Sequence, residues 1–131
     1  MIHSYPHEND VASAIVQAAF RIHVTLGPGL LESVYEAALA HEMEMAGIHF
    51  LRQASFAAHY GDVILKDVGF RVDFLVESRV IVEIKSVEKL SPVHFKTILT
   101  YLKQSDRKLG LLINFNCALI KDGLHRVVNG L

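Results

Sequence analysis

At residues 70–86 the chain reads Phe70-Arg71-Val72-Asp73-Phe74-Leu75-Val76-Glu77-Ser78-Arg79-Val80-Ile81-Val82-Glu83-Ile84-Lys85-Ser86. Two apolar, β-branched runs flank a short polar turn, which is the pattern of a β-hairpin. Charged residues interrupt both runs: Asp73 lies in the first, and Glu83 and Lys85 lie two residues apart in the second. Charged side chains rarely sit inside such strands unless they are paired or bind a metal. The hairpin is therefore the first place to look for a functional site.

The charges also indicate the register of the hairpin. A three-residue loop at 77–79 places Asp73 opposite Glu83, whereas a two-residue loop would put these acids on opposite faces. With the three-residue loop, Lys85 joins the two acids on one face. We expect the other face to be apolar and buried. Its members are Val72, Phe74, Val76, Val80, Val82 and Ile84.

Two carboxylates about 5 Å apart across neighbouring strands repel each other unless a positive charge lies between them. A hard divalent cation such as Mg²⁺ suits an oxygen-only site with few protein ligands. Lys85 would then stand beside the metal, where it can orient a nucleophilic water or meet a phosphate oxygen. The alternative is a surface cluster of ion pairs in which Arg71 and Lys85 shield the acids. Spacing alone does not separate the two interpretations.

The composition is that of one globular domain. The chain has 131 residues, of which 51% are hydrophobic and 21% charged. We expect residues 1–131 to form a single domain, with residues 1–9 as a loose N-terminal extension. The net charge of −1 argues against a strong attraction of the whole molecule to nucleic acid, but it does not exclude a local basic patch.

Several features favour a cytoplasmic protein over a membrane protein. No apolar run reaches the length needed to span a bilayer, and the N-terminus lacks the pattern of a signal peptide. The single cysteine, Cys117, rules out an internal disulfide and fits a reducing compartment, where it is most simply a small core residue. The eight histidines show no zinc-type spacing.

Two helices are expected before the hairpin. Residues 10–26 repeat apolar side chains at helical spacing after Asn9 or Asp10 as the cap. A second helix is expected from about residue 30 to residue 46, with Gly47 as its stop. Its expected packing stripe consists of Leu31, Val34, Ala38 and Leu39.

Glu32 and Tyr101 each have two interpretations. Glu32 is either a first-turn acid that favours the helix dipole or a carboxylate aimed at the hairpin, with Tyr35 and Glu36 beside it at helical spacing. Tyr101 is either a half-buried packing residue with a wet hydroxyl or part of a polar stripe with Thr97.

The remaining pattern predicts a mixed sheet. Residues 49–60 read as a strand with an irregularity near Ala54, and the strand that enters the hairpin starts at residues 63–66, which together give an antiparallel meander of three strands. Ser91 and Pro92 open a third helix, whose expected apolar side is Val93, Ile98, Leu99 and Leu102. Residues 109–115 form a buried strand, and residues 124–128 an edge strand. The crossover helix lets the buried strand run parallel to a meander strand. We therefore expect an α/β fold with helices flanking the sheet.

These motifs together resemble the GxxExxY protein family, which comprises small bacterial and archaeal members of the PD-(D/E)xK nuclease superfamily. The family motif stands here as Gly29-Leu30-Leu31-Glu32-Ser33-Val34-Tyr35, and the D…ExK core as Asp73 and Glu83-Ile84-Lys85. Further matches are Arg52-Gln53, Tyr60-Gly61, Ser91-Pro92-Val93-His94, Tyr101-Leu102 and Leu109-Gly110-Leu111-Leu112-Ile113-Asn114-Phe115. The likeness covers nearly the whole chain from about residue 10.

The resemblance implies a restriction-endonuclease-like core of a helix, a three-stranded meander, a helix and a strand. It also implies Mg²⁺-dependent hydrolysis of phosphodiester bonds in DNA or RNA, with Mn²⁺ as a substitute metal. Asp73, Glu83 and Glu32 would bind the metal, and Lys85 would position the attacking water or stabilise charge.

The resemblance also gives Tyr35, Thr97 and Tyr101 the task of positioning the substrate. Many relatives carry glutamine where this chain has Thr97, and threonine reaches less far toward a phosphate. Two alternatives follow. One is a catalytically weak or inactive module of the same fold that binds nucleic acid or a protein partner, and the other is a homodimer closed by exposed apolar edges.

Overall fold

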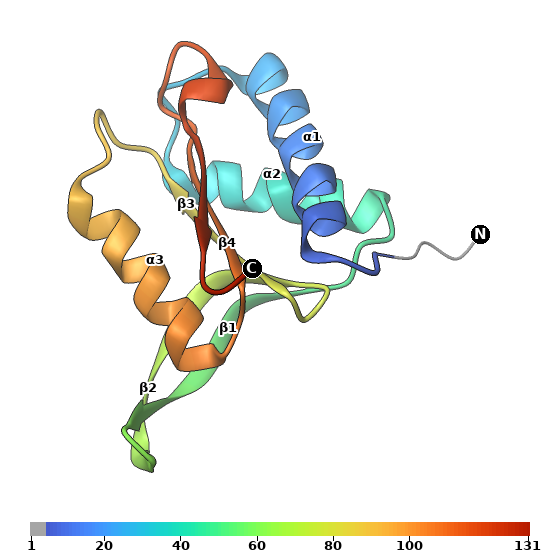
Figure 1. Cartoon of the computed structure of the whole chain (residues 1–131). Helices are drawn as coiled ribbons and strands as arrows, with labels where there is room; N and C mark the ends of the chain where they lie inside the picture. Colours follow the sequence, from blue (N-terminus) through green and yellow to red (C-terminus); the bar gives the residue numbers. More distant parts are fainter. Residues whose placement is uncertain (1–4) are drawn as a thin grey trace.

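A computed structural model describes residues 5–131 (Figure 1). The first two helices are α1, Glu8–Leu26, and α2, Glu32–Met45. The meander is made of β1, Phe50–Tyr60, β2, Val63–Val76, and β3, Val80–Lys85. Helix α3, Pro92–Ser105, leads into β4, Leu109–Asn114, and a short 3-10 turn, η1, Ile120–Asp122, precedes β5, Leu124–Val128.

The five strands form one mixed sheet in the order β1-β2-β3-β4-β5. Every neighbouring pair is antiparallel except β3 and β4, which run parallel through the crossover of α3. Helices α1 and α2 cover one face and α3 covers the other, while the outer parts of β1 and β2 project beyond the helices as a ribbon (Figure 1). The expected α/β, restriction-endonuclease-like architecture is confirmed.

The register of the β2–β3 hairpin is also as expected. Val76 pairs with Val80 and Phe74 with Val82, which leaves residues 77–79 as a three-residue loop. Glu77 and Ser78 both adopt left-handed backbone angles, with φ of 51° and 56°. The loop therefore turns tightly enough to keep Asp73 level with Glu83.

One expectation about the sheet faces was wrong. All six residues of the expected apolar face are buried, but Val72 packs in the cluster under α3, whereas Phe74 packs in the cluster under α1 and α2. The alternation of faces therefore slips by one residue at Asp73. In β1 the residue level with Asp73 is Gln53, whose φ of 53° is left-handed, so both strands slip together and the register continues unchanged.

Helix α1 begins two residues earlier than expected. Its N-cap is His7, whose Nδ1 accepts from the main-chain N–H of Asn9, and the Asp10 carboxylate accepts from the N–H of His7. Glu8 and Asn9 thus belong to the helix and not to a loose extension, and residues 1–4 of that extension lie outside the described residues.

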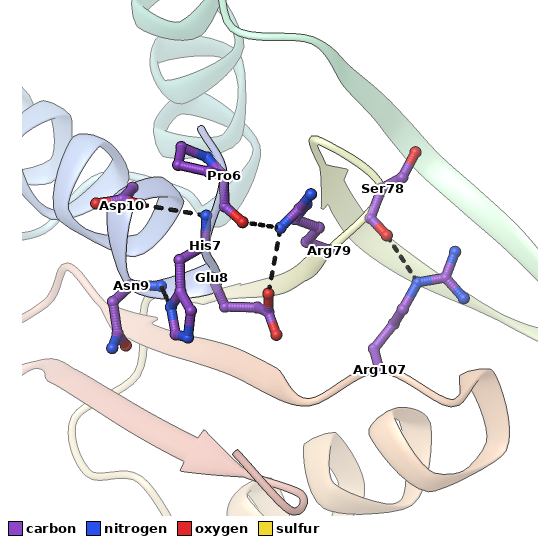
Figure 2. A network of polar contacts seen from close by, with 8 residues as sticks. All are labelled: Pro6, His7, Glu8, Asn9, Asp10, Ser78, Arg79 and Arg107. Carbon is purple, nitrogen blue, oxygen red and sulfur yellow. Dashed lines mark hydrogen bonds and ion pairs between the residues drawn. The ribbon is translucent and has the colours of Figure 1, made fainter. Parts of the chain in front are cut away.

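The turn of the β2–β3 hairpin is held by contacts to three other segments, and Figure 2 shows those of Arg79 and Ser78. The Arg79 guanidinium donates to the carbonyl of Pro6 and to the Glu8 carboxylate. Arg107 Nε donates to the Ser78 carbonyl over 2.9 Å. The Glu77 carboxylate accepts from the main-chain N–H of His49 over 2.6 Å. The closed end of the hairpin is therefore tied to the N-terminal segment, the start of β4 and the start of β1.

The buried faces of two helices differ from the expected stripes. In α2 the buried residues are Tyr35, Leu39, Ala40 and Met43. Leu31 precedes the helix and is 75% exposed, because α2 starts only at Glu32 and turns the large ring of Tyr35 inward. In α3 Val93 is likewise exposed, although Ile98 and Leu102 are buried as expected. Within residues 5–131, none of the helices has both the length and the apolar character to cross a bilayer.

Candidate active site

Two acids meet where the hairpin ladder stops. Beyond the Phe74–Val82 pair, the main-chain N–H of Asp73 donates to Glu83 Oε1 over 3.2 Å, and Asp73 Oδ2 accepts from the N–H of Ile84 over 2.7 Å. Side-chain oxygens thus take the place of main-chain carbonyls in this part of the ladder. The two carboxyl groups lie side by side between the strands, as the predicted register requires.

Burial gives this pair unusual proton affinities. It raises the pKa of Glu83 to about 8, and the negative charge of Asp73 and a hydrogen bond between the two carboxyls act in the same direction. Burial also raises the pKa of Asp73, against the lowering effect of the Ile84 N–H. Two adjacent buried carboxylates resist carrying two negative charges near neutral pH. Without a cation between them, the pair therefore holds a proton.

Lys85 follows Glu83 on the same face of β3. A small cavity of about 90 Å³ lies between this face and α3, and its polar lining comes from Glu83, Lys85, His94, Thr97 and Tyr101. The ion pairs found within residues 5–131 join Arg21 to Glu42, Arg52 to Glu36 and Arg79 to Glu8. None of these neutralises the hairpin acids, so the geometry does not favour a surface cluster shielded by Arg71 and Lys85.

Glu32 stands at the first position of α2, exposed at the edge of the site. Burial of its carboxyl raises the pKa of Glu32, the charge of Lys85 lowers it, and the charges of Asp73 and Glu36 raise it. Glu32 is therefore close enough to the hairpin site for their charges to interact. It remains separate from the carboxyl pair that Asp73 and Glu83 form.

The loop before α2 explains how Glu32 is placed. Gly29 has a φ of 101°, a backbone angle that favours glycine. The Tyr35 hydroxyl donates to the Gly27 carbonyl over 2.6 Å and accepts from the N–H of Leu30 over 3.2 Å. Ser86 Oγ donates to the Leu30 carbonyl over 2.6 Å. The end of β3 thus holds the loop that leads into Glu32.

Tyr35 is buried, and this corrects its expected role. It has no exposed surface, its ring stacks on Phe115 with centroids 4.6 Å apart, and its hydroxyl bonds to the main chain of the loop. No substrate can contact a side chain in this position. We therefore assign Tyr35 to anchoring the loop rather than to positioning the substrate by contact.

Three further polar residues support the acids and were absent from the expected site. Gln53 Nε2 donates to Glu36 Oε1 over 2.8 Å and lies 3.4 Å from Asp73 Oδ1. Arg52 Nε donates to the other oxygen of Glu36 over 2.7 Å. Gln53 therefore links the acid of α2 to the acid of β2. The Arg52-Gln53 pair in the sequence was the signal that could have pointed to them.

Tyr101 both packs against the sheet and belongs to a polar stripe with Thr97. Its ring stacks on Phe70 with centroids 4.8 Å apart, which is a packing role. Burial raises the pKa of Tyr101, and the charges of Glu83 and Asp73 raise it further, so the hydroxyl lies near the acids. Thr97 lines the same cavity one turn earlier.

The arrangement can be compared with known proteins. A sequence model of the PD-(D/E)XK nuclease superfamily matches residues 9–127. The chain belongs to the PD-(D/E)XK nuclease superfamily. Comparisons with curated proteins and with solved structures gave no match.

Nucleases of the PD-(D/E)XK superfamily typically use divalent metals. The donor set here fits a hard cation, because Asp73 and Glu83 offer adjacent carboxylate oxygens that otherwise retain a proton. No three His, Cys, Asp or Glu side chains within residues 5–131 lie close enough together to form a metal cage. The structure thus brings Asp73 and Glu83 together and leaves Glu32 apart from them, and their role as metal ligands stays a prediction.

Proposed function

We propose that this protein is a Mg²⁺-dependent nuclease that hydrolyses phosphodiester bonds of DNA or RNA. The observation that supports it best is the half-buried carboxyl pair of Asp73 and Glu83, hydrogen-bonded across the strands beside Lys85 in a PD-(D/E)XK fold. A structural ion pair would have its countercharge in place, whereas no ion pair within residues 5–131 reaches these two acids and burial raises the pKa of both.

Each residue has a defined task in this proposal. Asp73 and Glu83 hold the cation, and Glu32 completes the set of acids. A bound Mg²⁺ or Mn²⁺ supplies a Lewis acid that lowers the pKa of water and offsets charge on the phosphate. Lys85 directs its ammonium group at the attacking water or at the phosphate. Tyr101 and Thr97 face the substrate from α3.

A non-catalytic module is the second candidate. Thr97 occupies the position where many relatives of the GxxExxY family, to which we propose this chain belongs, carry glutamine, and the net charge is near neutral. On this alternative the same face of the sheet binds nucleic acid or a protein partner without cleaving it.

The deciding experiment compares the wild type with Asp73→Ala and Lys85→Ala, in Mg²⁺ and in Mn²⁺, on single-stranded, duplex and supercoiled substrates. We expect Asp73→Ala to abolish both metal binding and cleavage. We expect Lys85→Ala to keep the metal, measured by calorimetry, and to lose cleavage. Lys89→Ala is the matched control, because it removes an exposed lysine four residues further on. A wild type that leaves every substrate intact, or that cleaves no faster than Lys85→Ala, would refute the nuclease proposal.

A homodimer is a separate proposal about assembly. The β1–β2 ribbon projects from the domain (Figure 1). At the turn between its strands it exposes three large apolar side chains, Tyr60 by 79%, Val63 by 59% and Ile64 by 64%. A second copy packed on this turn would cover them. Light scattering on the wild type and on Ile64→Lys tests it, because the dimer should dissociate in the variant.

A further inference from the structure

His94 is held in one tautomer by the start of α3. Ser91 is the N-cap, and its main-chain N–H donates to His94 Nδ1 over 3.0 Å. A main-chain N–H can only donate, so Nδ1 must accept and the proton of the neutral ring must sit on Nε2. The capping box that starts the helix therefore also fixes which ring nitrogen carries a hydrogen.

The Nε2–H of His94 has no hydrogen-bond partner among the residues that the structure describes. Within residues 5–131, the ring makes its hydrogen bonds to Ser91 alone, and both involve Nδ1. His94 is partly exposed and lines the small cavity beside Lys85 and Glu83, one helical turn before Thr97. Its charge when protonated lowers the pKa of Glu32, so it also lies near the third acid. A fixed donor thus faces the site from the side opposite β3.

The chemistry of the cavity indicates an anionic oxygen as the partner. Lys85 supplies an ammonium group and His94 supplies its Nε2–H at the wall of one cavity. Donors of this kind bind phosphate oxygens, and a hydrogen bond to a charged acceptor is stronger than one between neutral groups. Because Thr97 is short, His94, one turn earlier on the same face of α3, is the residue left to donate a hydrogen bond to such an oxygen.

We propose that His94 is a substrate-binding residue whose Nε2–H donates to a non-bridging oxygen of the scissile phosphodiester. The proposal rests on the nuclease function proposed above and adds a residue to it. The imidazole donates this hydrogen bond from Nε2 and transfers no proton. It fixes the phosphate between α3 and Lys85 while the acids of the hairpin hold the cation.

A purely structural role would use only Nδ1, and three variants separate the two nitrogens. His94→Gln keeps the cap, since a glutamine oxygen at this position can accept from the N-cap N–H, and it retains an amide donor. His94→Glu keeps the cap but has no donor. His94→Ala loses both. Val93→Glu is the matched control, because it adds the same charge at an exposed position of the same helical turn.

The test measures kcat and KM on a substrate that the wild type cleaves, thermal unfolding of each variant, and anisotropy of a fluorescent oligonucleotide in Ca²⁺. We expect His94→Gln and Val93→Glu to stay within a few-fold of the wild type. We expect His94→Glu to lose about 10- to 100-fold in kcat/KM with an unchanged Tm. His94→Ala should lose the same activity and also melt earlier.

The outcomes distinguish the two proposals. If His94→Glu cleaves and binds as Val93→Glu does, His94 only caps the helix and the inference is wrong. If His94→Gln is as impaired as His94→Glu, a donor at this place is not what matters, and the inference is wrong as well. If the wild type and Lys85→Ala are equally inert, the nuclease proposal fails first. Oligonucleotide binding then decides about His94. A phosphate contact predicts that His94→Gln binds as tightly as the wild type and that His94→Ala binds more weakly at a temperature where both are folded, whereas equal binding by the two variants would overturn the inference.

Discussion

Asp73 and Glu83 are hydrogen-bonded through the main chain of one and the carboxylate of the other, over 3.2 Å. The Asp73 carboxylate in turn bonds to the main chain at Ile84, directly after Glu83. Neither acid can change its rotamer without disturbing a main-chain partner of the other strand. The two acids therefore behave as one unit, and their titration and their cation binding should be inseparable.

The metal-free protein should lose stability as the pH rises from about 5 to 8. Because the pKa of Glu83 is raised from 4.5 to about 8, the folded protein keeps a proton there that the unfolded chain releases. The folded state then binds more protons than the unfolded state in this window, so the free energy of unfolding falls with pH, by on the order of a few kcal/mol. Urea unfolding at pH 5.5, 7 and 8.5 in EDTA measures the effect. The Glu83→Gln variant should lack it, and an identical slope in both proteins would contradict the assignment.

Cation binding should release a proton from the carboxyl pair. Since the pair holds a proton without a cation, the apparent affinity for Mg²⁺ should rise about tenfold per pH unit between pH 6 and 8. Calorimetry in two buffers of different ionisation heat counts the released protons. Asp73→Asn serves as the comparison, because it removes the Asp73 charge, which after burial is the next largest cause of the raised pKa of Glu83. A pH-independent affinity in the wild type would count against a shared proton.

Gln53→Gly should separate backbone strain from site geometry. The φ of 53° at Gln53 favours glycine, so the backbone gains up to about 1 kcal/mol. The same change removes the amide that donates toward Glu36 and Asp73, so Mg²⁺ affinity should fall several-fold. The control is Asp67→Gly, at another left-handed residue with a φ of 59° on the projecting ribbon. Equal metal affinity in the two variants would show that the amide is dispensable.

Tyr35→Phe should loosen the loop that leads into Glu32. The ring and its stacking on Phe115 remain, but the bonds to Gly27 and Leu30 are lost, at a cost of about 1–3 kcal/mol. In Tyr35→Phe both kcat and the affinity for Mg²⁺ should fall, because Glu32 is then held less firmly. The double variant with Glu32→Gln therefore should bind Mg²⁺ no more weakly than Glu32→Gln alone. Additive losses would mean that Tyr35 acts by another route.

Glu32→Gln should weaken Mg²⁺ binding without unfolding the protein. The side chain is exposed at the first position of α2, so removing its charge costs little stability beyond a helix-dipole term of about 0.3–1 kcal/mol. Glu44→Gln, on the exposed side of the same helix, is the control for charge loss. Unchanged affinity would exclude Glu32 from the ligands.

The hairpin register could be predicted from the sequence because only one loop length brings Asp73 level with Glu83. The change of sheet face between Val72 and Phe74 could not be predicted. Both faces of β2 are buried there, so an apolar residue fits either side, and the pattern carries no information about which helix it meets. The slip shows only in the backbone of Gln53, a residue type with no special preference for a left-handed angle.

The role of Tyr35 and the position of the α1 cap were both predicted wrongly. The helical spacing of Tyr35 from Glu32 suggested a polar role. The ring can nevertheless be buried, because its hydroxyl finds two main-chain hydrogen-bond partners inside the protein. The cap of α1 is a histidine nitrogen, outside the usual set of capping side chains, so the pattern favoured Asn9 or Asp10 instead. Glu36 and Gln53 were missed because the contact between them joins elements that are distant in sequence.

The bracing of the turn at Glu77, Ser78 and Arg79 determines where the hairpin can yield. Contacts to three other segments hold β2 and β3 together at this end, and Figure 2 shows those of Arg79 and Ser78. Their main-chain ladder ends at Phe74 and Val82, and beyond it the two strands are joined only by the side chains of the two acids. Any change in the distance between the two carboxyl groups on binding a larger ion is therefore confined to the end of the hairpin at Asp73 and Glu83. Exchanging Mg²⁺ for Mn²⁺ should leave hydrogen exchange of the main-chain amides at residues 77–79 unchanged.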